Sequence, residues 1–335
     1  MTGRIEFISI LFLFKWFMII SRDTEEIEFD KNSAVTVGTF DGVHIGHQQI
    51  FDELKKIKQQ TGCRTIVVTF DPHPQIVLKN KHHDHNKPIR LLSTTEEKLE
   101  LFKKAGIDIA RIISFTEKFA DTPAKDFFEN YIIKKTGITD LVIGYDHHFG
   151  KNREGSIETI KELSAENGFK VHKVDEYTLG SEIVSSTLIR NFLCSGEIQK
   201  ANVLLGKYYS LTGKVVEGFK RGKELGYPTA NIEVQSEYKL IPASGIYAVR
   251  CTVNGKMYFG MMSIGFNPTF NDVKKQTLEV NIFDFDNNIY GEEIKIEFLE
   301  YIRGELKFDS TESLKQKINS DKEKTLSIIN KLHVN

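Results

Sequence analysis

The chain has 335 residues, with 45 basic and 46 acidic side chains and a formal net charge of −1. This balance argues against a dedicated nucleic-acid-binding protein, which usually carries a basic excess. The length suits two domains that each bury a core. The three cysteines, Cys63, Cys194 and Cys251, form neither a metal-binding spacing nor an even disulfide set. We therefore expect a reducing, cytoplasmic compartment, with each cysteine a small apolar residue that is buried or partly buried.

The N-terminal segment is apolar, but its role is open. Residues 8–20 are interrupted by Lys15, are too few to span a bilayer, and lack the small-residue cleavage site of a signal peptide. Three interpretations remain: a weak membrane anchor, an extra apolar strand, or an extension upstream of a true start near Met18. We favour the extension, because Met18 directly precedes a plausible first strand.

From residue 34 to about residue 175, predicted strands and helices alternate. Apolar, β-branched runs predict the strands, and apolar residues three and four apart predict the helices. The expected strands are 34–37, 64–70, 109–114, 141–144 and 170–174, and the expected helices are 48–60, 94–105, 124–135 and 157–166. This alternation predicts a parallel sheet with crossover helices, in which ligands bind at the carboxyl ends of the strands.

The most informative segment follows the first of these strands. Residues 38–47 read Gly-Thr-Phe-Asp-Gly-Val-His-Ile-Gly-His. His44 and His47 stand at a helix start, where free N–H groups and the helix dipole favour a phosphate. Being three residues apart, they face the same way and can stabilise charge on a leaving pyrophosphate. The other nucleotide-binding candidates are Gly38, Phe40 and Asp41, with Gly42 and Gly46 allowing close approach to the backbone.

Residues 38–47 resemble the nucleotide-binding signature of the nucleotidylyltransferase superfamily, and in detail the adenylyltransferase half of the bifunctional riboflavin kinase/FAD synthetase family. Residues 184–190, Val-Ser-Ser-Thr-Leu-Ile-Arg, resemble the second signature of that superfamily. Hydroxyls and free N–H groups at a helix start, with a guanidinium one turn later, can grip phosphates, although Ser-Ser-Thr alone is most often a helix cap. The candidates here are Ser185, Ser186 and Thr187 for phosphate binding and Arg190 for catalysis.

Two more polar loops follow predicted strands of the first half. Residues 69–74, Thr-Phe-Asp-Pro-His-Pro, form a loop that its prolines stiffen. Residues 144–150, Gly-Tyr-Asp-His-His-Phe-Gly, offer aromatic faces that suit a flat ring, although a polar loop around a buried Phe149 is the alternative. By the resemblance, the flavin-binding candidates are Asp71, His73, Asp146 and Phe149. His147 departs from the phenylalanine of many relatives, so stacking at that position is open.

After about residue 207, strand-like runs predominate. They are 208–216, 246–253, 256–262, 277–283 and 293–299, and Asn254-Gly255 between two of them is a strong hairpin signal. We expect an antiparallel barrel or sandwich, closed by a helix from about residue 310 to residue 332. Between the halves, residues 187–205 predict one or two helices with a break at Ser195-Gly196.

Residues 213–232 contain a glycine-rich, basic loop. Gly218, Gly222 and Gly226, together with Lys220, make a flexible segment that can cover ATP phosphates, although an ordinary exposed loop is an equal alternative from these residues alone. The stretch resembles the riboflavin kinase signature that ends in Pro-Thr-Ala-Asn. By that resemblance Thr229 and Asn231 bind Mg²⁺ and phosphate oxygens, and both offer the hard oxygen ligands that Mg²⁺ requires.

Glu279 lies in a predicted strand, on the same face as Asn281. Taken alone, an acid on such a strand most often faces solvent. The resemblance makes Glu279 the general base that accepts the proton of the ribityl 5′-hydroxyl. It also places Arg303 near the flavin.

The resemblance extends over about residues 34–314, and its four signatures occur in the expected order. It implies an FMN adenylyltransferase (FAD synthetase) domain at 18–190, a helical linker at 191–206 and a riboflavin kinase domain at 207–335. The substrates would be ATP, riboflavin and FMN, with Mg²⁺ as cofactor and neither nucleic acid nor membrane as partner; the oligomeric state is open. The alternatives are a nucleotidylyltransferase with a non-flavin acceptor and an inactive flavin-binding or regulatory protein.

Overall fold

The computed structural model describes residues 17–23, 25, 27–81, 88–145, 149–151, 154–218, 226–268 and 274–334. The chain divides into two compact units, one made of Met1–Ile89 and Thr95–Tyr177 and the other of Arg90–Thr94 and Thr178–Asn335. Asp146, Lys220 and Gly222, which were predicted as site residues, lie outside the described residues. No helix among the described residues is both long and apolar enough to cross a membrane.

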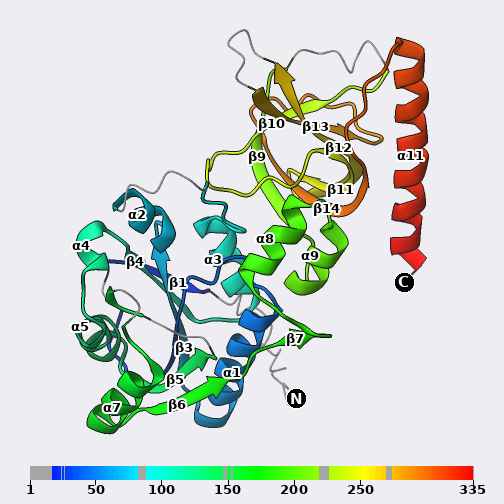
Figure 1. Cartoon of the computed structure of the whole chain (residues 1–335). Coiled ribbons are helices and arrows are strands. Elements are labelled where there is room, and N and C mark those ends of the chain that lie inside the picture. Colours follow the sequence, from blue (N-terminus) through cyan, green and yellow to red (C-terminus); the bar gives the residue numbers. More distant parts are fainter. Residues whose placement is uncertain are drawn as a thin grey trace, which may run out of the picture. The chain divides into compact units, whose positions relative to one another are not determined.

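The first unit contains the predicted parallel sheet, with six strands in the order β1-β4-β3-β2-β5-β6 (Figure 1). Their bounds are β1 Ile19–Arg22, β2 Ser33–Val37, β3 Arg64–Asp71, β4 Ile109–Ser114, β5 Ile138–Gly144 and β6 Lys170–Val174. The strand order reverses beside β2, because β3 and β4 continue on one side of it and β5 and β6 lie on the other. Such a switch point is where ligands bind in parallel sheets, and the signature of residues 38–47 starts there.

Helices cover both faces of this sheet. α1 (Ile45–Thr61) and α3 (Thr95–Lys104) pack on one face, where Leu54 and Phe102 join its core. The opposite face is covered by α7 (Ile157–Asn167) and by the segment 124–136. That segment was predicted as one helix, but it is divided into α5 (Ala124–Phe127), a π-helix η1 (Phe128–Ile133) and α6 (Lys134–Thr136). Two short helices, α2 (Pro74–Lys81) and α4 (Glu117–Ala120), were not predicted.

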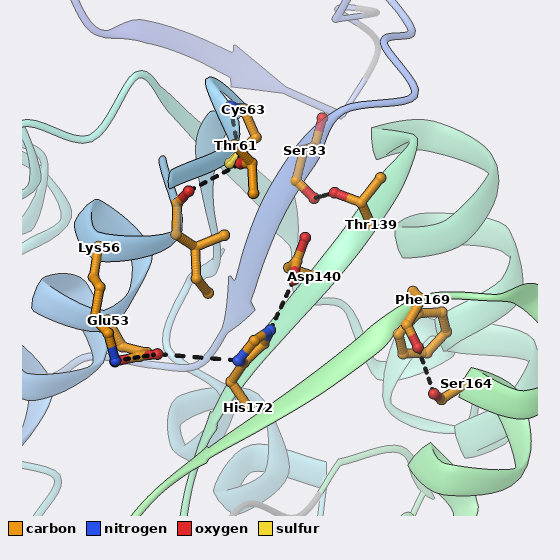
Figure 2. Close-up of polar contacts among 11 residues, drawn as sticks. Ser33, Glu53, Lys56, Thr61, Cys63, Thr139, Asp140, Ser164, Phe169 and His172 are labelled. Atoms are coloured by element: carbon orange, nitrogen blue, oxygen red, sulfur yellow. Dashed lines mark hydrogen bonds and ion pairs between the residues drawn. The ribbon is translucent and has the colours of Figure 1, made fainter. Parts of the chain in front are cut away.

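Polar contacts also hold α1 on the sheet. His172 of β6 lies between Asp140 of β5 and Glu53 of α1 (Figure 2). Its Nε2 is 2.7 Å from Asp140 Oδ1, and its Nδ1 is 4.0 Å from Glu53 Oε1. Glu53 also pairs with Lys56 one turn later, at 3.2 Å. His172 thus lies between the sheet and α1, the helix that begins directly after His44 and carries His47 in its first turn.

The second unit contains a closed antiparallel barrel in the order β10-β13-β12-β11-β14-β9. Its strands are β9 Ser210–Val216, β10 Ala230–Glu233, β11 Gly245–Val253, β12 Lys256–Pro268, β13 Lys274–Ile282 and β14 Glu293–Arg303. The predicted hairpin is confirmed: Val253 pairs with Lys256 around Asn254 and Gly255, whose φ angles are 47° and 74°. The open choice between barrel and sandwich resolves to a barrel, which leaves no free sheet edge.

Helices complete the second unit (Figure 1). α8 (Ser186–Cys194) and α9 (Ile198–Leu205) flank the predicted break, where Gly196 has a φ of 81°. β7 (Thr178–Leu179) and β8 (Glu182–Ile183) form a small hairpin before them. α11 (Thr311–Val334) packs on the barrel through Ile328 and Ile329. The domain bounds drawn from the sequence stay predictions.

The three cysteines are all free thiols. Cys63 and Cys251 are buried, as expected. The expectation is wrong for Cys194, which is exposed. It is the last residue of α8, where the helix ends and its surface is open to solvent.

Candidate active sites

The loop after β2 has an unusual backbone. Phe40 and Val43 have φ angles of 48° and 43°, and Gly42 between them has a φ of 80°. Positive φ is strained for residues with side chains and persists only where the surroundings enforce it. Phe40 is 2% exposed and packs against the rings of His47, Phe51 and Phe102. The core therefore holds this loop in a fixed conformation.

The two histidines of the loop lie side by side. His44 is the residue that precedes α1, and His47 is in the first turn of the helix. Their rings stack with centroids 3.6 Å apart and an interplanar angle of 21°. A Cβ on Gly46 would lie 3.2 Å from the His44 ring, so glycine leaves room for that arrangement. The first turn of α1 has no acidic residue, and the positive end of a helix dipole attracts anions.

A buried lysine beneath this loop was missed from the sequence. Lys98 of α3 is 3% exposed, and its Nζ donates to the Thr39 carbonyl oxygen at 3.2 Å and to Thr69 Oγ1 at 3.4 Å. Burial lowers the pKa of the Lys98 ammonium, while Asp41 and Asp71 act in the opposite direction. The lysine thus joins the loop after β2 to the end of β3. Its spacing of four from the core residue Phe102 is the sequence signal that could have found it.

The predicted flavin-side residues of the first unit lie near the ends of β3 and β5. Asp71 accepts a hydrogen bond from Arg22, Nη1 to Oδ2 at 3.3 Å. His73 is buried, and its Nδ1 accepts from the Gln75 N–H at 3.2 Å. Phe149 is 7% exposed and packs in the core, 4.8 Å from the Phe128 ring. The flavin-binding roles of all three stay predictions.

The second signature begins α8, in the second unit. Ser185 caps the helix, since its Oγ accepts from the Leu188 N–H at 3.3 Å. Ser186 and Thr187 occupy the first turn. Arg190 follows one turn later, and its Nε donates to the carbonyl oxygen of Arg90 at 2.7 Å. The cap interpretation and the phosphate interpretation are compatible, because a capped helix start still presents N–H groups.

A polar cluster in the barrel joins the two signatures of the second half. Asn231 of β10 is paired in register with Glu279 of β13. The Thr229 hydroxyl donates to Glu279 Oε2 at 3.2 Å, and Asn281 Nδ2 donates to the Pro228 carbonyl oxygen at 2.7 Å. Glu279 is half-buried rather than a solvent-facing strand residue. The predicted Mg²⁺ ligands and the predicted base are therefore neighbours, although their roles stay predictions.

The chemistry of this cluster fits Mg²⁺ bound together with ATP. Thr229 and Asn231 offer a hydroxyl and an amide oxygen, which are hard ligands, and Mg²⁺ usually takes its remaining ligands from waters and substrate phosphates. Gly218 lies directly against Asn231: a Cβ there would come 1.9 Å from Asn231 Nδ2. Within the described residues, no group of three or more His, Cys, Asp or Glu side chains forms a separate metal cage.

Two pairs of side chains are among the contacts of helix α11 with this part of the barrel. Tyr227 directly precedes the Pro-Thr-Ala-Asn segment, and its hydroxyl donates to Asn319 Oδ1. Arg303 donates to Asp321 from Nε and Nη2, each at 2.8 Å, and Asp321 is buried. Gly226, which precedes Tyr227, has a φ of 84°, a conformation that favours glycine. Arg303 thus anchors α11, and its flavin-binding role stays a prediction.

Comparison with known proteins gives matches over nearly the whole chain. The family model for FAD synthetase matches residues 26–188, and that for riboflavin kinase matches residues 205–329. A Listeria monocytogenes protein named bifunctional riboflavin kinase/FMN adenylyltransferase is 41% identical over 303 residues, which is 90% of this chain and 94% of that protein. A Bacillus subtilis protein of the same name is 35% identical over 308 residues, 91% of this chain and 95% of its own.

A solved structure also covers both units. It is titled as a macrolide-efflux protein from Streptococcus pneumoniae and superposes with a TM-score of 0.81 at 31% identity. The match covers 92% of this chain and 99% of that one.

Proposed function

Since this chain belongs to the family of bifunctional riboflavin kinase/FMN adenylyltransferases, we propose which of its residues carry the two reactions. The enzyme works in flavin cofactor biosynthesis: it phosphorylates riboflavin to FMN with ATP, and it adenylylates FMN to FAD with release of pyrophosphate. The observation that carries our proposal is the hydrogen bond between Thr229 and Glu279 at 3.2 Å. It supports a general base and Mg²⁺ ligands placed together in the region of the riboflavin kinase match.

In the kinase reaction, Glu279 accepts the proton of the ribityl 5′-hydroxyl of riboflavin. The hydroxyl oxygen forms a bond to the γ-phosphorus of ATP, the bond from that phosphorus to the β–γ bridging oxygen breaks, and ADP leaves. The Thr229 hydroxyl orients the carboxylate through its hydrogen bond. Thr229 and Asn231 would hold Mg²⁺, whose charge favours the ATP phosphates when it is bound. The glycine-rich segment that begins at Gly218 and ends at Gly226 directly precedes these residues in the sequence. We propose that it covers the ATP phosphates.

In the adenylyltransferase reaction, no protein nucleophile is needed. A phosphate oxygen of FMN forms a bond to the α-phosphorus of ATP, the bond to the α–β bridging oxygen breaks, and pyrophosphate leaves. His44, His47 and the first N–H groups of α1 stabilise the charge on the leaving group. Arg190 and the hydroxyl residues at the start of α8 bind phosphate oxygens. Lys98 acts indirectly, by fixing the loop that presents the histidines.

We also propose a cytoplasmic location. All three cysteines are free thiols, and free thiols persist where the compartment is reducing.

The decisive experiment is incubation of the purified full-length chain with riboflavin and Mg-ATP, followed by chromatographic separation of the flavins. FMN should form first and FAD later, with ADP and pyrophosphate as the other products. Adding FMN in place of riboflavin should give FAD alone. If the chain binds flavin but forms neither FMN nor FAD, it is an inactive flavin-binding protein; if it adenylylates only another acceptor, the flavin assignment is wrong.

A further inference from the structure

A buried lysine in the riboflavin kinase region contacts a segment from the FAD synthetase region. Lys239, in the loop between β10 and β11, is 5% exposed, and its Nζ lies 4.8 Å from the centroid of the Tyr209 ring. The same Nζ donates to the Leu92 carbonyl oxygen at 2.7 Å. Leu92 falls within the FAD synthetase match at residues 26–188, whereas Lys239 falls within the riboflavin kinase match at residues 205–329.

The segment Arg90–Thr94 is built into the second unit, although the first unit precedes and follows it in the sequence. The Leu91 N–H donates to the Tyr238 carbonyl oxygen at 2.7 Å, and the Leu240 N–H donates to the Leu91 carbonyl oxygen at 2.8 Å. The Tyr209 hydroxyl fixes the same loop, because it donates to the Leu240 carbonyl oxygen at 2.6 Å. The segment is therefore held by a main-chain ladder and by the Lys239 side chain.

This segment in turn holds the guanidinium of the second signature. Arg190 Nε donates to the Arg90 carbonyl oxygen at 2.7 Å, and Arg90 Nη1 lies 3.3 Å from Cys194 Sγ at the end of α8. The loop that carries Lys239 also contacts α8 directly, since the Ala243 N–H donates to the Leu193 carbonyl oxygen at 3.0 Å. A continuous path of contacts thus runs from Lys239 through Leu92 and Arg90 to Arg190.

We propose that Lys239 is a positioning residue for Arg190, so that a side chain of the riboflavin kinase region supports FMN adenylyl transfer. The Lys239 ammonium fixes the Leu92 carbonyl and, through it, the main chain at Arg90 two residues earlier. The Arg90 carbonyl then orients the Arg190 guanidinium toward its phosphate. This inference rests on the proposed role of Arg190 in the adenylyltransferase reaction. A displacement of about 1 Å in a positioned group can cost up to about 100-fold in rate, so the adenylyltransferase activity should respond strongly.

The test compares Lys239→Met with Lys239→Arg in the full-length protein. Methionine keeps the apolar stem but removes the cation and its donors, whereas arginine keeps a cation and hydrogen-bond donors. Lys239→Met should lower kcat for FAD formation from supplied FMN by about 10- to 100-fold, while riboflavin phosphorylation stays near the parent rate. Lys239→Arg should recover much of the lost FAD formation. The matched control is Lys324→Met, because Lys324 also donates to a main-chain carbonyl, that of Ile302 at 3.1 Å, and should leave FAD formation unchanged.

A double-mutant cycle with Arg190→Ala separates positioning from general damage. If Lys239 acts through Arg190, adding Lys239→Met to Arg190→Ala should lower FAD formation little further. Equal losses in the parent and in the Arg190→Ala background would overturn the proposal, and so would parent-level FAD formation by Lys239→Met. If Arg190→Ala itself leaves FAD formation intact, the assigned role of Arg190 is wrong, which is a separate result.

A milder variant keeps the proposal testable if Lys239→Met does not fold. Tyr209→Phe keeps the ring beneath Lys239 but removes the hydrogen bond to the Leu240 carbonyl oxygen. It should lower FAD formation in the same direction by a smaller factor, with riboflavin phosphorylation in the same sample showing that the barrel is intact. Unchanged FAD formation by Tyr209→Phe, in the absence of a folded Lys239→Met, would overturn the proposal.

Discussion

The Thr229 hydroxyl and the Glu279 carboxylate are joined by a hydrogen bond, Oγ1 to Oε2, of 3.2 Å. The two residues come from different signatures and are brought together by the antiparallel pairing of β10 with β13. One carboxylate oxygen of Glu279, Oε2, accepts the hydrogen bond from Thr229, and the other oxygen can accept a proton from a substrate. The pair therefore gives the first prediction its physical basis.

Glu279→Gln should abolish the base while keeping the shape of the side chain and its contact with Thr229. A positioned general base typically contributes about 100- to 10,000-fold, so riboflavin phosphorylation should fall by a factor in that range. FMN supplied from outside should still become FAD at the parent rate. The control is Glu297→Gln, which removes the same charge elsewhere on the barrel, where Glu297 pairs with Arg250 at 2.7 Å. Parent-level phosphorylation by Glu279→Gln would show that Glu279 is not the base.

Asn231→Ala should raise the Mg²⁺ concentration needed for riboflavin phosphorylation, because one hard oxygen ligand is lost. Gly218→Ala should act in the same direction, since its Cβ would come 1.9 Å from Asn231 Nδ2 and displace the amide. Mg²⁺ titrations of both activities in each variant provide the measurement. An unchanged Mg²⁺ dependence of phosphorylation in both variants would remove Asn231 from the Mg²⁺ site.

His44→Ala or His47→Ala should reduce FAD formation while riboflavin phosphorylation continues. Each change removes a donor that stabilises charge on the leaving pyrophosphate, and loss of one such donor costs about 100-fold or more in rate. Pyrophosphate release from ATP and FMN is the direct measurement. An equal fall in both activities would contradict the assignment of the pair to adenylyl transfer.

Lys98→Met should lower FAD formation, whereas Lys98→Arg should retain part of it, because only the arginine keeps a donor toward Thr39 and Thr69. The pKa of Lys98 in the folded protein lies below its ordinary value of 10.5 because of burial. Between the folded pKa and 10.5, the unfolded state therefore binds more protons than the folded state. The free energy of unfolding increases with pH in that window. Denaturant unfolding at several alkaline pH values should show the free energy of unfolding of the parent rising relative to that of Lys98→Met. No such relative rise would mean that the ammonium is not desolvated.

Iodoacetamide should modify one cysteine of the native protein. Cys194 is exposed, whereas Cys63 and Cys251 are buried, and burial raises the pKa of the Cys251 thiol to about 12. The thiolate is the reactive form, so Cys251 should stay unmodified in mildly alkaline buffer. Peptide mass spectrometry should find the label on Cys194 alone, and on all three cysteines after denaturation. Labelling of native Cys251 would contradict its burial.

Local patterns predicted the elements whose signals are short-range. The helix that became α1 was found from the spacing of Ile50, Phe51, Leu54 and Ile57, all of which are buried. The hairpin at Asn254 was found from two residues that tolerate positive φ. Strand β10 was missed, because four residues after a proline give a weak pattern, and their strand conformation comes from pairing with distant β9 and β13.

In the candidate sites too, residues placed by contacts distant in the sequence were not predicted. His44, His47, Thr229 and Glu279 were each singled out from motifs, and the contact between Thr229 and Glu279 came from the structure. Lys98 and Lys239 did not stand out, because lysine is usually exposed and is buried only where tertiary contacts satisfy its charge. The place of Arg90–Thr94 in the second unit depends on main-chain pairing with residues 238–240, which no local pattern reports. Cys194 was misjudged because the end of α8 is open to solvent.

The contacts of α11 with the barrel join segments that are synthesised at different times. Tyr227 and Arg303 find their partners Asn319 and Asp321 on a helix that is translated after every barrel strand. At about 5–20 residues per second, its 24 residues add roughly one to five seconds. The elements that carry His44, His47 and Arg190 have left the peptidyl-transferase centre by then. The contacts that α11 makes with Tyr227 and Arg303 thus form only after the segments that carry His44, His47 and Arg190 have been synthesised.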